Sequence, residues 1–188
     1  MKGVPPGPVR FTCCGDGNCC RHAIPLVEVD DVRRLMAEVG LHPREFVRLY
    51  AAGDMGDLVA REGQEAWLET TQGARVMGLR RRADQCLFLD GDNRCRVYPS
   101  RPLNCRIYPI DYLYSDNGTG IRVRRQPWCG GRHVGELDRR ELLGLARRYN
   151  AASTRTERLV ARWNRETAGA AKPTEFLDFL AEHLNGRR

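Results

Sequence analysis

The chain has 188 residues, of which 41% are hydrophobic, so it can bury the core of one compact domain, and we expect residues 1–188 to fold as a single unit. Its 31 basic residues exceed its 24 acidic ones, for a net charge of +7, but the arginines are dispersed and not interleaved with aromatic residues, so we do not expect direct binding to nucleic acid. No apolar run is long enough for a signal peptide or a transmembrane helix, which favours a cytoplasmic protein without membrane association.

The first cysteine motif follows an extended arm at residues 1–10, where closely spaced prolines disfavour both a helix and a central strand. The motif reads FTCCGDGNCC, and its two glycines let the backbone fold tightly enough for Cys13, Cys19 and Cys20 to approach one centre. Adjacent cysteines usually point apart, so either one of Cys19 and Cys20 binds metal while the other packs, or the two serve neighbouring metals. Because cytoplasmic thiols stay reduced, the eight cysteines are better explained as metal ligands or redox groups than as disulfides.

Helix and strand signals alternate between the first cysteine motif and the second. The pattern predicts a short strand at 26–29 and a helix at 31–39, which Asp30 caps and Gly40 ends. A second helix is expected from Pro43, because Phe46, Val47 and the apolar residues after them recur at helical spacing. We further expect a helix at 65–70 and a strand at 75–82.

The second cysteine motif, CLFLDGDNRCRVYPSRPLNCRIYP at 86–109, combines strand and turn signals. Strands at 86–90 and 94–98 around a turn at 91–93 predict a β-hairpin in which Cys86 and Cys95 can converge. Ser100 is expected to cap a helical turn that begins at 101–102 and stops before residue 109. Cys105 lies early in that turn, where backbone amides and neighbouring arginines favour a thiolate, the form that binds metal.

The last third of the chain is predicted to be helical. First, a second hairpin is expected from strands at 110–114 and 121–125 around the turn SDNGTG. Asp138 and Glu141 fit a capping box at the start of a long helical region, and a final helix is expected from about residue 174. The predicted fold is a small cysteine-rich α+β domain, with two β-hairpins and a metal-centred loop core at 11–131 wrapped by helices, followed by a helical extension at 138–188.

The two cysteine motifs together resemble the YkgJ-type cysteine-cluster family, a zinc- or iron-chelating CxxCxxCC domain related to the flagellin lysine N-methylases. The resemblance covers residues 11–131 and rests on the pattern F-x-C-x-x-C-G-x-C-C and on C-x-F-L followed by C-x-x-Y-x-x-R-P-x-x-C-R-x-Y-P. It implies a metal-ligand set of Cys13, Cys19, Cys20, Cys86, Cys95, Cys105 and Cys129. The chain departs from the family pattern at one position. Asp16 replaces the second cysteine of the first motif, and an extra Cys14 stands beside Cys13. Either Asp16 or Cys14 supplies the missing ligand, or the site is one ligand short.

The spacing of the cysteines does not choose between zinc and an iron–sulfur cluster, since it matches neither a standard zinc ribbon nor the bacterial ferredoxin run. The resemblance to the lysine N-methylases, which are associated with an iron–sulfur cluster, favours a 4Fe-4S cluster. We therefore expect a metal-binding protein that holds a 4Fe-4S cluster or zinc. Two alternatives remain: an iron–sulfur-dependent methyl or group transferase that uses S-adenosylmethionine, and a zinc-stabilised adaptor for nucleic acid or protein.

Four residues of the second motif have two interpretations. Arg101 and Arg106 either hold the cysteine loops by hydrogen bonds, with Tyr98 and Tyr108 packed beside the centre, or the four residues bind a cofactor. In the second case the planar guanidinium groups suit a carboxylate, such as that of S-adenosylmethionine, or a phosphate. No catalytic motif in the sequence identifies an enzyme, and substrate, protein partner and oligomeric state do not follow from it.

Overall fold

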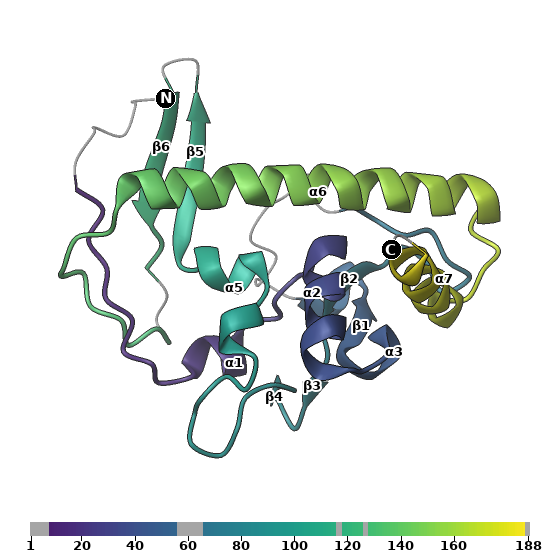
Figure 1. The fold of residues 1–188 in the computed structure, drawn as a ribbon, viewed down its shortest axis with the longest axis horizontal. Helices are drawn as coiled ribbons and strands as arrows, with labels where there is room; N and C mark the ends of the chain where they lie inside the picture. Colours follow the sequence, from purple (N-terminus) through teal and green to yellow (C-terminus); the bar gives the residue numbers. More distant parts are fainter. Residues whose placement is uncertain (1–7, 56–65, 116–117, 126–127, 187–188) are drawn as a thin grey trace.

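One long helix, α6 (Arg139–Thr167), spans the molecule, and most of the other helices lie along one side of it (Figure 1). The computed structural model describes residues 8–55, 66–115, 118–125 and 128–186. Helix α6 begins where the sequence predicts, because the Asp138 carboxylate accepts the N–H of Arg140 at 2.7 Å and caps the first turn. An apolar stripe along α6 is buried against the rest of the chain.

The fold is mixed α+β, as predicted, with three antiparallel sheets of two strands each among the described residues. Strand β1 pairs with β2, β3 with β4, and β5 with β6. The strands are β1 (Val47–Tyr50), β2 (Val76–Leu79), β3 (Arg81–Arg82), β4 (Gln85–Cys86), β5 (Ile110–Ser115) and β6 (Gly118–Val123). The other helices are α1 (Asn18–His22), α2 (Val29–Val39), α3 (Pro43–Phe46), α4 (Ala52–Met55), η2 (Tyr98–Ser100), α5 (Leu103–Ile107) and α7 (Pro173–Asn185).

Two apolar cores pack against α6 at different positions along its length. The first half of the helix packs with α5 and the β5–β6 hairpin, where Leu145 and Tyr149 meet Ile107 and Tyr112. The second half packs with α2, α7 and the β1–β2 sheet, through side chains that include Trp163. Between the two apolar segments, α6 turns the polar residues Ser153 and Thr156 toward the interior. The two cores are therefore separated by a polar interval on the same helix.

Several predicted elements are confirmed. Helix α2 ends at Gly40, whose φ of 66° is the left-handed value that suits glycine. Strands β5 and β6 form the predicted hairpin, with Tyr112 opposite Ile121, although the central Asn117 lies outside the described residues. Helix α7 forms the predicted final helix, and β2 and β3 occupy the strand expected at 75–82. No helix in the described ranges is both long and apolar enough to cross a membrane.

The hairpin predicted around Gly91 is wrong in extent. Leu89 and Cys95 form only an isolated bridge, and Cys86 belongs to β4, which pairs backwards with β3. Residues 98–100 turn into η2 and do not continue a strand. Ser100 does not cap α5, because its hydroxyl hydrogen bonds to Glu38 at 2.9 Å and the residue before α5 is Pro102.

Three other predictions also need correction. The helix expected from Pro43 is one turn long and gives way to β1, because Val47 and Tyr50 pair with β2 far along the chain. Residues 66–70 are not helical, while residue 65 lies outside the described chain. The strand expected at 26–29 is reduced to a single bridge from Leu26 to Gly78, because α2 begins at Val29, earlier than predicted.

Candidate metal centre

Helix α1 presents the adjacent cysteines Cys19 and Cys20 from a tight entry turn. Gly17, which precedes the helix, has a φ of 70°, and a Cβ at this position would lie 3.1 Å from both Leu89 and Arg21. A side chain here would therefore meet steric strain both in the backbone and against its neighbours. The glycine lets α1 pack closely against the loop of the second cysteine motif.

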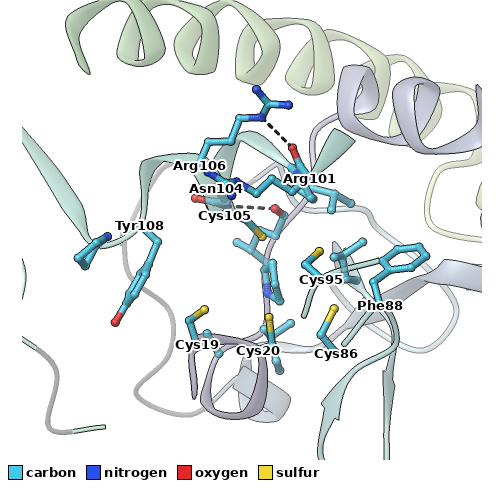
Figure 2. A pocket seen from close by; sticks show the side chains of 18 of the residues that line it. Cys19, Cys20, Cys86, Phe88, Cys95, Arg101, Asn104, Cys105, Arg106 and Tyr108 are labelled. Carbon is cyan, nitrogen blue, oxygen red and sulfur yellow. Dashed lines mark hydrogen bonds between the residues drawn. The ribbon is translucent and has the colours of Figure 1, made fainter. Parts of the chain in front are cut away.

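The second motif supplies three thiols from three different backbone contexts. Cys86 is buried in the short strand β4, Cys95 forms the bridge with Leu89, and Cys105 lies inside α5. Figure 2 shows these thiols facing the same space as those of Cys19 and Cys20. The structure thus brings five predicted ligands from α1, β4, the following loop and α5 around one space.

All eight cysteines line a single cavity of about 1020 Å³. The five thiols named above form its inner group, which comprises Cys19, Cys20, Cys86, Cys95 and Cys105. Cys13, Cys14 and Cys129 line the cavity beside Asp16, and we call these four residues the outer group. Within the described parts of the chain, no set of three or more histidine, cysteine, aspartate or glutamate side chains is arranged as it stands to hold a metal ion. Binding a metal would therefore require these side chains to move closer together.

The inner thiols strongly perturb one another's ionisation. Hydrogen bonding to the Cys20 thiol raises the pKa of Cys19 well above its usual range. Contact with Cys19 lowers the pKa of Cys20, but contact with Cys86 and burial outweigh this effect and raise that pKa to about 11. Conversely, the Cys20 thiol lowers the pKa of Cys86 by hydrogen bonding to it. Such coupling follows from gathering several ionisable thiols close together in a partly buried space.

Burial dominates at the other two inner thiols. It raises the pKa of Cys105 well above the ordinary thiol value, and the nearby Cys20, Cys19 and Cys95 add to the effect. Burial also raises the pKa of Cys95, while the positive charge of Arg101 acts in the opposite direction. A bound cation would stabilise all of these thiolates and release their protons.

The outer group contains the position at which the sequence departs from the family pattern. Asp16 does not point freely into the cavity, because its carboxylate accepts the backbone N–H and the side-chain amide of Asn18 at 3.0 and 2.9 Å. The Cys14 thiol hydrogen bonds to Asp16, which raises the pKa of that thiol. Gly130 lies directly against this pair, since a Cβ there would be 2.6 Å from Asp16 Oδ2 and 3.1 Å from Cys14 Sγ. Cys13 is exposed, and its Sγ accepts the N–H of Gly15 at 3.4 Å.

Cys129 lies beside a stack of three aromatic rings. Tyr108 stacks on Trp128 with ring centres 5.6 Å apart, and Trp128 stacks on His22 at 5.5 Å. The Tyr108 hydroxyl is buried without a well-formed hydrogen bond, and burial together with the adjacent Cys129 thiol raises its pKa above the usual range. Tyr108 therefore packs beside Cys129 as a neutral phenol.

The two arginines of the second motif lie differently. Arg106 donates its Nε–H to the carbonyl of Arg101 at 3.1 Å and another N–H to the carbonyl of Pro99, so much of its guanidinium group braces the loop (Figure 2). Arg101 stacks over the ring of Tyr98, with its guanidinium carbon 3.8 Å from the ring centre. Tyr98 itself is 61% exposed.

Sequence reasoning missed the polar residues that line the cavity away from the thiols. Glu28 is only 8% exposed, and Thr156 and Asn104 line the same cavity. Burial raises the pKa of Glu28 to about 7, although a hydrogen bond from Thr156 acts in the opposite direction. A sequence signal existed, because Ser153 and Thr156 interrupt the apolar stripe of α6 at the positions that face this cavity.

The donor set fits a thiophilic metal. Thiolates are the ligands that zinc and iron–sulfur clusters take from proteins, and the inner group holds five thiols with no carboxylate among them. Cys19, Cys20, Cys86, Cys95 and Cys105 would hold the metal. When bound, it would cross-link loops that are far apart in the sequence, and an iron–sulfur cluster would in addition supply electron transfer.

A comparison with protein families agrees with this geometry. A family model named CxxCxxCC, described as "Putative zinc- or iron-chelating domain", matches residues 12–130. No curated protein and no solved structure matches the chain. The matched region begins in the first cysteine motif and ends just after Cys129, which confirms the resemblance expected from the sequence. The chain belongs to the CxxCxxCC cysteine-cluster family.

Proposed function

We propose that this protein binds an iron–sulfur cluster, of the 4Fe-4S type, through the inner thiols Cys19, Cys20, Cys86, Cys95 and Cys105. The observation that carries the proposal is that the cavity collects these thiols from four separate segments. A single structural zinc takes four ligands, usually from short paired motifs, whereas five thiols here surround one larger space. Four of them would bind the cluster, and the fifth would pack beside it.

The test is anaerobic purification, followed by an absorption spectrum and measurement of iron, sulfide and zinc per chain. The proposal expects a brown protein with matched iron and sulfide. A colourless protein with stoichiometric zinc would contradict the cluster and leave zinc as the metal. Neither metal after anaerobic reconstitution would contradict metal binding by this chain.

Two serine variants test which group of thiols holds the cluster. Cys86→Ser removes a buried inner thiol, and we expect it to lose most of the iron. Cys13→Ser removes an exposed outer thiol and should retain the iron, which makes it a matched control. Equal loss in the two variants would indicate that the outer group also ligates the cluster. In that case Cys14→Ser and Asp16→Ala would identify the ligand that replaces the missing family cysteine.

The size of the cavity favours a second candidate, a cluster-dependent methyl or group transferase. A volume of about 1020 Å³ matches pockets that enclose an organic ligand, and side chains such as Glu28 and Asn104 line it in addition to the thiols. This candidate expects the cluster-loaded protein to bind S-adenosylmethionine, which isothermal titration calorimetry would measure. Absence of binding would count against the transferase and leave the metal-binding proposal unchanged.

A further inference from the structure

Arg101 is a cation on the cavity wall that the protein does not neutralise. Its side chain lines the cavity, and none of the carboxylates in the described ranges forms a salt bridge with it. Its Nε–H is buried and has no hydrogen-bond partner. A buried donor on a charged group costs free energy unless a ligand satisfies it.

The backbone and the side chain of Arg101 are both held in place. Its carbonyl accepts hydrogen bonds from Arg34 Nη2 and Arg106 Nε, each at 3.1 Å. The guanidinium plane stacks on Tyr98 at 3.8 Å, which restricts its rotation. The arginine thus presents its donors from a fixed position and loses little conformational entropy when it binds a ligand.

The surroundings of Arg101 carry positive charge. The guanidinium groups of Arg34 and Arg106 both reach the backbone of Arg101, where they donate to its carbonyl. The buried acid beside Arg34, Asp31, is already bonded to that arginine at 2.6 Å. The net field at this wall of the cavity therefore favours an anion.

We propose that the cavity binds an oxyanion, a carboxylate or a phosphate group, through the guanidinium of Arg101 next to the thiols. The planar fork of arginine can donate two parallel hydrogen bonds to either group. The volume of the cavity leaves room for the molecule that carries the anion. This inference adds a ligand to the cavity of the proposed metal centre. It rests on the proposed function only because the experiment uses the metal-loaded protein.

The experiment titrates the anaerobically reconstituted full chain with inorganic phosphate and, separately, with acetate, at constant ionic strength. We expect one of the two to bind, and the Kd to rise at least tenfold in Arg101→Gln, which corresponds to about 1.4 kcal/mol. Arg82→Gln is the matched control, because Arg82 is an exposed arginine outside the cavity and its loss should leave the Kd unchanged. Preference for phosphate identifies a phosphate-bearing ligand, and preference for acetate a carboxylate.

A second measurement uses the unmodified protein, in case Arg101→Gln folds poorly. Phenylglyoxal modifies accessible arginines, and the preferred anion should protect the peptide that contains Arg101 but not the one that contains Arg82. The proposal is overturned if neither anion binds, if Arg101→Gln binds as well as the unsubstituted chain, or if the anion protects no arginine of the cavity. It is also overturned if Arg101→Gln loses metal together with anion binding, because Arg101 would then serve as a countercharge to the thiolates. Metal content is measured on the same samples. A protein that binds no metal would therefore contradict the proposed function, whatever the result for anion binding.

Discussion

Raising the pH from 5 to 8 should destabilise this protein through Glu28. The carboxyl is 8% exposed, has no cationic partner among the described residues, and interacts with the nearby acids Asp31, Glu157 and Asp30. Burial is the main cause that raises its pKa from 4.5 to about 7. Between these two values the folded state holds the proton more tightly than the unfolded state, so stability falls as the pH rises through this window and stays low above it.

The size of the effect follows from the shift in the pKa of Glu28. At 1.36 kcal/mol per pH unit, a shift from 4.5 to about 7 gives a ceiling of about 3 kcal/mol, of which about 2 kcal/mol should be lost between pH 5 and pH 8. Glu28→Gln is neutral at every pH and should be more stable than the unsubstituted chain at pH 8 by nearly the full ceiling of about 3 kcal/mol. At pH 5 the two should be similar.

The assay is urea denaturation followed by tryptophan fluorescence at several pH values, under reducing conditions. The difference between the unsubstituted chain and Glu28→Gln isolates this carboxyl from other titrating groups. Glu182→Gln is the control, because Glu182 is exposed on α7 and is not among the acids that interact with Glu28, so its loss should leave the pH dependence unchanged. If the curves of Glu28→Gln and the unsubstituted chain stay parallel from pH 5 to pH 8, Glu28 is ionised without penalty and the reasoning fails.

Three further predictions concern stability. Asp31→Ala should lower the free energy of unfolding by about 3 kcal/mol in urea titrations. The reason is that the buried carboxylate accepts the N–H groups of Glu28 and Leu103 and pairs with Arg34. A loss no larger than that of the exposed control Asp92→Ala would contradict this prediction. Gly17→Ala should cost about 1–2 kcal/mol, because φ is 70° and Leu89 is close, whereas Gly91→Ala, with open space around it, should be nearly neutral in the same assay. Chelation of the metal should lower the thermal midpoint. If the metal had been present at 100 times its Kd, its removal costs about 2.7 kcal/mol of stabilisation. An unchanged midpoint in calorimetry would argue against coupling between metal binding and folding.

The elements that were predicted correctly depend on local signals. Helix α6 follows from the Asp138 cap and its apolar stripe, and the end of α2 follows from Gly40. The elements that were missed depend on pairing between distant segments. Val47 and Tyr50 fit a helical stripe, but they form a strand because residues 76–79 are available as a partner. Cys86 pairs with Arg81, which precedes it, and not with the strand expected at 94–98. The turn signal at 91–93 does not determine which of the two segments becomes the partner.

The candidate site was predicted in its ligand types but not in its grouping. The cysteine pattern gave all eight thiols, and the structure divides them into an inner group of five and an outer group beside Asp16. That division depends on where α1 packs against the second motif, which no local pattern encodes. Glu28 was missed because it was assigned to the strand expected at 26–29, and Asp31 because acidic residues in the first turn of a helix usually stay exposed. Here both are buried at the junction of several elements.

The cysteine cavity lies between the two apolar cores that pack along α6. On α6 the apolar stripe that includes Leu145 stops near Ala152 and resumes at Leu159, with Ser153 and Thr156 facing the cavity between them. Hydrophobic packing therefore stabilises each end of the molecule but leaves the middle open. The cysteine segments border this open space, and the short helix α1, which carries Cys19 and Cys20, has no buried residue of its own. A metal bound by thiols from four segments would connect the two cores where packing does not, and residues such as Arg101 and Glu28 could then line the remaining space for a ligand without the need to form a core themselves.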